Sequence, residues 1–113
     1  MFTKFDEHDM LELFESEPSI IPPEEAGMYI YSKLNQNGVK LLLDLSVYEH
    51  KCHILLCIGE DAFFETELKN VEYLRREGNC LRIHRFDSES DYLLYFFPNF
   101  FMKIENFGET EFR

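Results

Sequence analysis

The spacing of apolar residues changes once along the chain, from a helical period to the alternation of a strand. Near the start, Met10, Leu13 and Phe14 are spaced i, i+3, i+4, so they share one face of a helix. Asp6 precedes them and can cap the first turn. These positions predict a helix over about residues 6–16, apolar on one face and acidic on the other.

Prolines separate this helix from the rest of the chain. Pro18 cannot continue a helix, and the residues before Pro22 and Pro23 are held out of the α conformation. Residues 17–26 are therefore predicted to form an extended connector.

From residue 27 onward, apolar and polar residues alternate as they do in half-buried strands. The clearest run places five apolar side chains on one side of a strand, namely Val39, Leu41, Leu43, Leu45 and Val47. Turn signals such as Asn37-Gly38 and Gly59-Glu60-Asp61 separate successive runs. Consecutive hairpins of this kind predict a β-meander over residues 27–106.

The turn at Gly78-Asn79 predicts a specific register. As a two-residue turn it places Glu77 opposite Cys80 and Arg75 opposite Arg82. Two facing arginines are unfavourable unless acids lie nearby. We therefore expect acidic segments to supply carboxylates to this pair, from the same molecule or from a second copy.

Together these elements predict one α+β domain spanning residues 1–113, since a chain of this length can bury one core but not two. The N-terminal helix is expected to pack on one antiparallel sheet of about six or seven strands in a meander. Residues 92–97 and 100–104 are apolar on both faces. This part of the sheet is expected to be covered by the helix or to form an interface.

The composition adds a strong negative charge to this picture. The 113 residues contain 22 Asp and Glu against 11 Lys and Arg, a formal net charge of −11. Residues 1–26 carry a net −7 and residues 87–113 a net −4, while residues 27–86 are neutral. Because such a surface repels phosphates and anionic lipids, it disfavours direct binding to nucleic acid or membranes and favours a basic protein partner.

The cysteines and the N-terminus indicate the compartment. The three cysteines are odd in number and irregularly spaced, which is typical of reduced cysteines in the cytoplasm and not of a disulfide framework. The chain starts without a basic stretch followed by an apolar one, and it has no run of 18 apolar residues. We predict a cytoplasmic protein without an export signal or membrane span.

Candidate catalytic and metal-binding groups do not converge in the predicted strands. Four of them lie within eight positions: His50, Cys52, His53 and Cys57. Cys52 and His53 would point to opposite faces of a strand, which disfavours a tetrahedral zinc site. Cys80 and His84 would be about 13 Å apart along a strand, beyond hydrogen-bond reach. We therefore expect no catalytic residues, no metal and no cofactor.

Acids at turns and aromatic rings remain as candidate binding groups. An interface that steers a basic partner by charge and anchors it with a few rings has this composition. Four aromatic side chains are expected to be exposed: Tyr29, Tyr31, Phe63 and Tyr73. The candidate partner-binding residues are Glu60, Asp61, Asp87, Glu89, Asp91 and Tyr73.

Taken as a class, the chain resembles the small acidic immunity proteins that bacteria pair with secreted or contact-delivered toxins. The resemblance is carried by the size of the whole chain, its charge of −11, the absence of an active-site motif, and the acidic loops at 60–61 and 87–91. It implies a non-enzymatic inhibitor of a toxin or nuclease. Where such proteins neutralise nucleases, they place carboxylates where the phosphates of the substrate would sit.

Other functions stay open at this point. The chain can be a subunit of a homo-oligomer, such as a homodimer, or of a regulatory complex. The contact would then be the aromatic C-terminal strand with Phe96, Phe97, Phe100 and Phe101. A small enzyme or ligand-binding domain with an unrecognised site is a further alternative. The acids can also serve only to keep an aromatic-rich domain in solution.

Overall fold

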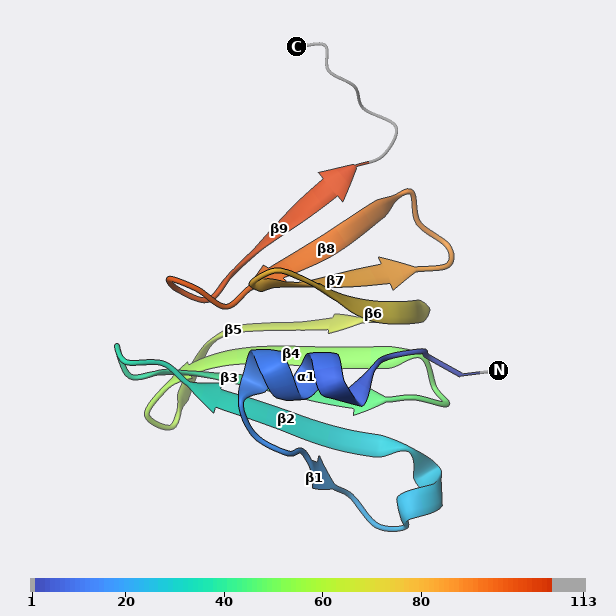
Figure 1. The fold of residues 1–113 in the computed structure, drawn as a ribbon, viewed down its shortest axis with the longest axis horizontal. Helices are drawn as coiled ribbons and strands as arrows, with labels where there is room; N and C mark the ends of the chain where they lie inside the picture. Colours follow the sequence, from blue (N-terminus) through green and yellow to red (C-terminus); the bar gives the residue numbers. More distant parts are fainter. Residues whose placement is uncertain (1, 107–113) are drawn as a thin grey trace.

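A computed structural model describes residues 2–106, which form one α-helix, one short 3₁₀ helix and nine strands (Figure 1). The helix α1 spans Glu7–Phe14. The strands are β1 (Ser19–Ile20), β2 (Met28–Leu34), β3 (Val39–Ser46), β4 (Lys51–Ile58), β5 (Asp61–Leu68), β6 (Val71–Glu77), β7 (Cys80–Arg85), β8 (Ser90–Tyr95) and β9 (Phe101–Asn106). The predicted α+β class is confirmed. The strands, however, form two antiparallel sheets and not one.

The first sheet has the order β1-β2-β3-β4-β5. Its predicted core positions on β3 are fully buried: Leu41, Leu43 and Leu45. At the β2–β3 hairpin, the Oδ1 atom of Asn35 accepts a hydrogen bond of 2.9 Å from the backbone N–H of Asn37. Gly38 follows with a φ of +84°, the conformation that the Asn-Gly signal predicts.

The second sheet has the order β6-β7-β8-β9 and shows the predicted hairpin register. Glu77 pairs with Cys80, and Arg75 pairs with Arg82 across the Gly78-Asn79 turn. The turn sequence alone predicts this register correctly, because a two-residue loop leaves a single pairing for the flanking strands.

The chain leaves the first sheet at Lys69 and Asn70, where the single-sheet prediction is wrong. Asn70 has a φ of +62°, in the left-handed region that asparagine tolerates better than most residues. The backbone N–H of Val71 then donates to the carbonyl of His50, in the β3–β4 loop, at 2.9 Å. As a result, β6 starts a new sheet and does not extend β5.

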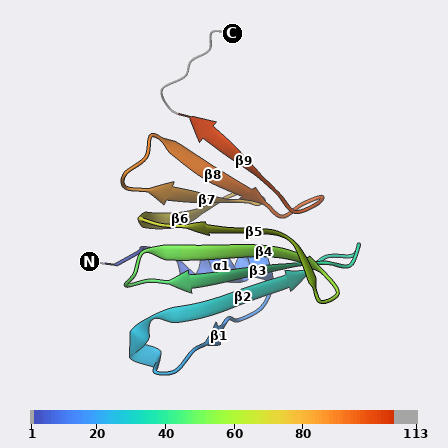
Figure 2. The same cartoon turned by 180° about the vertical axis from the view of Figure 1, so that it is seen from behind.

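The predicted N-terminal helix is present and covers one face of the sheets. The Asp6 side chain caps it by accepting hydrogen bonds from the backbone N–H groups of residues 8 and 9, at 2.8 and 3.2 Å. The ring of Phe14 lies 5.1 Å from that of Tyr31 on β2 and 5.0 Å from that of Phe96 after β8. Phe14 therefore joins both sheets in one core. Figure 2 shows the same strands from behind, with α1 on their far side.

The predicted connector is more ordered than a simple extended segment. Ile20 on β1 pairs with Tyr29 on β2, so this stretch adds an edge strand to the first sheet. The 3₁₀ helix η1 (Glu24–Ala26) follows and ends at Gly27, which has a φ of +68°. A Cβ atom at Gly27 would come within 2.9 Å of the Tyr48 ring, so both the conformation and the space favour glycine.

Candidate functional site

The acids predicted to bind a partner lie in two separate loops. Glu60 and Asp61 are exposed at the β4–β5 turn, and Asp87 and Glu89 are exposed in the β7–β8 loop. These two connections lie at opposite ends of the strands, on the left and on the right of Figure 1. The structure therefore does not bring the two acidic loops together.

Asp91 was placed in the same group, but its side chain is buried in the second sheet, with a residue exposure of 0%. Its carboxylate accepts a hydrogen bond of 2.8 Å from Nη1 of Arg82 and lies 2.7 Å from Nδ1 of His84. The cross-strand pairing of His84 with Asp91 brings these groups together. In this structure Asp91 is held by basic groups of its own chain.

Arg82 is the centre of a larger ion-pair network, the Arg82 network, on one face of the second sheet. It also contacts Glu77 at 2.8 Å and Glu105 at 2.6 Å. Hydrogen bonds to Glu77 and Asp91 raise the pKa of Arg82, and hydrogen bonds from Arg82 and Arg75 lower the pKa of Glu77. Asp91 and Glu105 of the acidic C-terminal segment compensate Arg82 as expected, whereas Arg75 is paired with Glu77 of its own hairpin.

The aromatic residues singled out from the sequence differ in their exposure. Phe63 is 55% exposed, as expected. Tyr73 is half-buried, with its ring stacked 4.9 Å from that of His84. Tyr29 is half-buried, and Tyr31 is only 2% exposed, so the expectation of an exposed Tyr31 is wrong. The pairing of Tyr31 with Leu43 explains this, because it places Tyr31 on the core face of β2.

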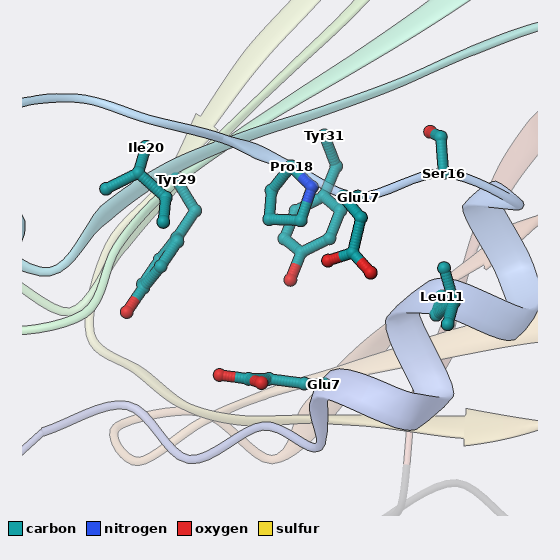
Figure 3. Close-up of a pocket in the computed structure, with 8 residues that line it drawn as sticks. All are labelled: Glu7, Leu11, Ser16, Glu17, Pro18, Ile20, Tyr29 and Tyr31. Atoms are coloured by element: carbon teal, nitrogen blue, oxygen red, sulfur yellow. The ribbon is translucent and has the colours of Figure 1, made fainter.

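A groove opens where α1, the segment after it and the first strands meet. It has a volume of about 110 Å³ and is lined by Glu7, Leu11, Ser16, Glu17, Pro18, Ile20, Tyr29 and Tyr31. We call it the Tyr31 groove. Figure 3 shows that the carboxylates of Glu7 and Glu17 and the hydroxyl of Tyr31 project into the same space.

Local chain geometry explains why these side chains converge. Glu15 ends the helix in the left-handed conformation, with a φ of 59°, and its N–H donates to the Leu11 carbonyl at 2.7 Å. Pro18 then forces an extended path, which leads the chain back beside β2 as strand β1. Glu17 therefore returns to the same groove that Glu7 enters from the first turn of the helix.

The burial of Tyr31 and the acids at the groove both act on the tyrosine hydroxyl. Burial, followed by the charges of Glu7, Tyr29 and Glu17, raises the pKa of Tyr31 to about 12. Among the residues that the structure describes, neither Glu7 nor Glu17 forms an ion pair. A second hollow of about 230 Å³ shares Glu7 and Tyr29 and adds Glu24 and Glu25. Acids therefore surround Tyr29 on both sides.

Sequence reasoning missed this groove, although its residues were visible. Glu7 lies in the predicted helix and Glu17 in the predicted connector, and the two tyrosines were expected to be exposed. The decisive signal is the register of β2 against β3, which pairs Tyr29 with Leu45 and Tyr31 with Leu43. That register turns both tyrosines toward the side that the helix covers.

The remaining titratable groups include three cysteines and the side chains that could ligate a metal ion. Within residues 2–106, no group of three or more His, Cys, Asp or Glu side chains is arranged to hold a metal ion. Cys52, Cys57 and Cys80 are free and buried, and burial raises the pKa of Cys52 to about 12. No helix in this range is long and apolar enough to cross a membrane.

Comparisons with known proteins give one informative result. No protein-family model matches the sequence, and no curated protein is significantly similar to it. Among solved structures, the fold is similar to a chain of a contact-dependent growth inhibition toxin–immunity protein complex from Klebsiella pneumoniae 342. The TM-score is 0.76 at 20% sequence identity, and the match covers 93% of this chain and 98% of that chain. At this identity the similarity shows a shared fold.

Proposed function

We propose that this chain is an immunity protein that neutralises a toxin by binding it, without catalysis. The observation that carries the proposal is the structural match to a chain of a toxin–immunity complex over nearly the full length of both chains. A match of that extent concerns the whole domain and not one shared motif. The sequence-based resemblance to acidic immunity proteins supports the same function independently.

The charge supports the inhibitory and not the toxic member of such a pair. A nuclease toxin must approach phosphates, and a surface with a net charge of −11 repels them. An inhibitor of that nuclease benefits from the same charge, because it is attracted to the basic cleft where the substrate binds. We propose that exposed carboxylates, including Glu60, Asp61, Asp87 and Glu89, steer the chain toward such a cleft in the cytoplasm.

Co-expression with a candidate toxin, taken from the products of the genes adjacent to this one, tests the proposal. We expect the chain to restore growth of cells that produce the toxin and to co-purify with it as a stable complex. A catalytically inactive toxin variant should still bind, because inhibition requires contact and not turnover. Toxicity that persists beside soluble chain, or toxicity of the chain alone, would contradict the proposal.

An oligomeric subunit remains a second candidate because of apolar surface near the C-terminal strand. Phe97 is 65% exposed, Phe101 44% and Ile104 56%. Phe96 and Phe100, also considered as contacts, are only 7% and 9% exposed and belong to the core. If this surface holds a homodimer, the apparent mass should stay dimeric at both roughly 50 and 300 mM salt. A monomer at both concentrations would contradict it.

A further inference from the structure

The buried side chain of Tyr31 presents its hydroxyl to the Tyr31 groove. Tyr31 is 2% exposed, its ring packs on Phe14, and its hydroxyl points into the groove (Figure 3). Within the described residues this hydroxyl has no hydrogen-bond partner. The hydroxyl oxygen is not one of the buried atoms left without a partner, so it faces the open space of the groove, where a polar group that enters from outside can hydrogen-bond to it.

The carboxylates at the groove differ from two neighbouring acids of the helical segment, Glu12 and Glu15. Glu12 lies 3.6 Å from Nη1 of Arg76, and Glu15 lies 3.3 Å from Nζ of Lys33. Glu7 and Glu17 form no such pair among the described residues. Their charges are therefore available to a cation that enters the groove.

The apolar lining of the groove suits a side chain with an aliphatic stem. Leu11 is 39% exposed and Ile20 45% exposed, on two sides of the opening, and Tyr29 presents a ring. Lysine and arginine bury their stems along such surfaces while the charged end seeks carboxylates or aromatic faces. A volume of about 110 Å³ exceeds the 10–15 Å³ that a single water requires, so it can accept the end of a side chain.

We propose that the Tyr31 groove receives a lysine or arginine side chain of the toxin. The cation lies between Glu7 and Glu17 and donates to the hydroxyl of Tyr31, while its stem packs on Leu11 and Ile20. This inference rests on the proposed immunity function and specifies where the toxin is held. A bare Ca²⁺ fits less well, because it needs six to eight oxygen ligands and tyrosine hydroxyls are not among its usual ligands.

The binding affinity for the purified, catalytically inactive toxin tests this proposal. We expect the double variant Glu7→Gln/Glu17→Gln to bind about 30-fold more weakly, because two charge-assisted contacts are lost. Tyr31→Phe keeps the buried ring and should weaken binding by about 3- to 10-fold, the loss of one hydrogen bond. Thermal unfolding of both variants, alone, confirms that the fold is intact.

A matched control separates local contact from net charge. Glu12→Gln/Glu15→Gln removes the same two charges from the helical segment, where both acids are already paired with basic side chains outside the groove, and should weaken binding by less than about threefold. If the wild-type chain binds the toxin and both double variants lose the same affinity, the groove proposal is overturned while the immunity function stands. If the wild-type chain does not bind the toxin, the immunity function itself fails.

Discussion

The Arg82 network and the Tyr31 groove are both rich in acids, but within residues 2–106 the acids form ion pairs in the network and none in the groove. In the network, one guanidinium contacts Glu77, Asp91 and Glu105. In the groove, Glu7 and Glu17 have no ion-pair partner among the described residues. Carboxylates paired with Arg82 link neighbouring strands of the second sheet. Carboxylates without a pair are not neutralised within the described part of the chain and can attract a basic group of a partner. The presence or absence of an ion pair in this part of the chain therefore distinguishes the acids of the network from those of the groove.

The largest difference between the two regions should appear in stability. Arg82→Ala leaves the buried Asp91 with only His84 beside it, so we expect a loss of about 3–5 kcal/mol in the free energy of unfolding. Urea denaturation measures it. Arg75→Ala is the matched control, since its ion pair with Glu77 is exposed and should contribute less than about 1 kcal/mol. Equal losses in both variants would mean that the network does not stabilise the fold.

The free energy of unfolding should fall at high pH because Tyr31 ionises. The pKa of Tyr31 is raised to about 12 in the folded chain, above the usual value of about 10 for an unfolded chain. The Tyr31 contribution is therefore fully present below about pH 10 and is lost as the pH rises through about 12, a loss of about 2–3 kcal/mol. Denaturation across this range should show a smaller loss in Tyr31→Phe. If stability falls equally with pH in Tyr31→Phe and in the wild-type chain, Tyr31 does not cause the loss.

The stability that Glu77 contributes to the Arg82 network should be lost at low pH. Hydrogen bonds from Arg82 and Arg75 lower the pKa of Glu77 in the folded chain. Its stabilising contribution is present above the unfolded pKa of about 4.3 and is lost as the pH falls through the lower folded value. Thermal unfolding midpoints should therefore fall less steeply in Glu77→Gln than in the wild-type chain below about pH 4.3. A steeper fall in the variant would contradict this sign.

The smallest effect on stability is expected for the groove acids. Glu7→Gln/Glu17→Gln removes charges that have no ion-pair partner in the described chain, so the free energy of unfolding should change by less than about 0.5 kcal/mol. Urea denaturation of this variant and of Arg82→Ala compares their losses in the free energy of unfolding. A loss of more than about 2 kcal/mol would show that these acids serve the fold.

Local patterns predicted the elements of this fold, but not how distant elements meet. The alternation around Leu43 and the turn at Gly78-Asn79 gave correct strands and a correct register, since both depend on neighbouring residues. The separation into two sheets depends on the backbone at Asn70, where no residue pattern shows which strand accepts the next hydrogen bonds.

The same limit applies to the candidate site. Asp91 lies in an acidic stretch that suggests an exposed loop, and only its cross-strand pairing with His84 reveals that it is buried. Glu7, Glu17 and Tyr31 come from three segments that meet through the docking of α1 and the pairing of β1 with β2. The sequence indicated the charge and the aromatic rings, but their convergence requires the tertiary structure.

The most direct test of the contrast between paired and unpaired acids is the association rate constant with the inactive toxin, measured by stopped flow at low salt. Two variants remove the same charge: Glu7→Gln/Glu17→Gln in the groove and Glu77→Gln/Glu105→Gln in the Arg82 network. We predict that the groove variant associates about tenfold more slowly, while the network variant stays within about twofold of the wild-type rate. Equal slowing in both variants, or slower association of the network variant, would contradict the claim that the unpaired carboxylates receive the partner.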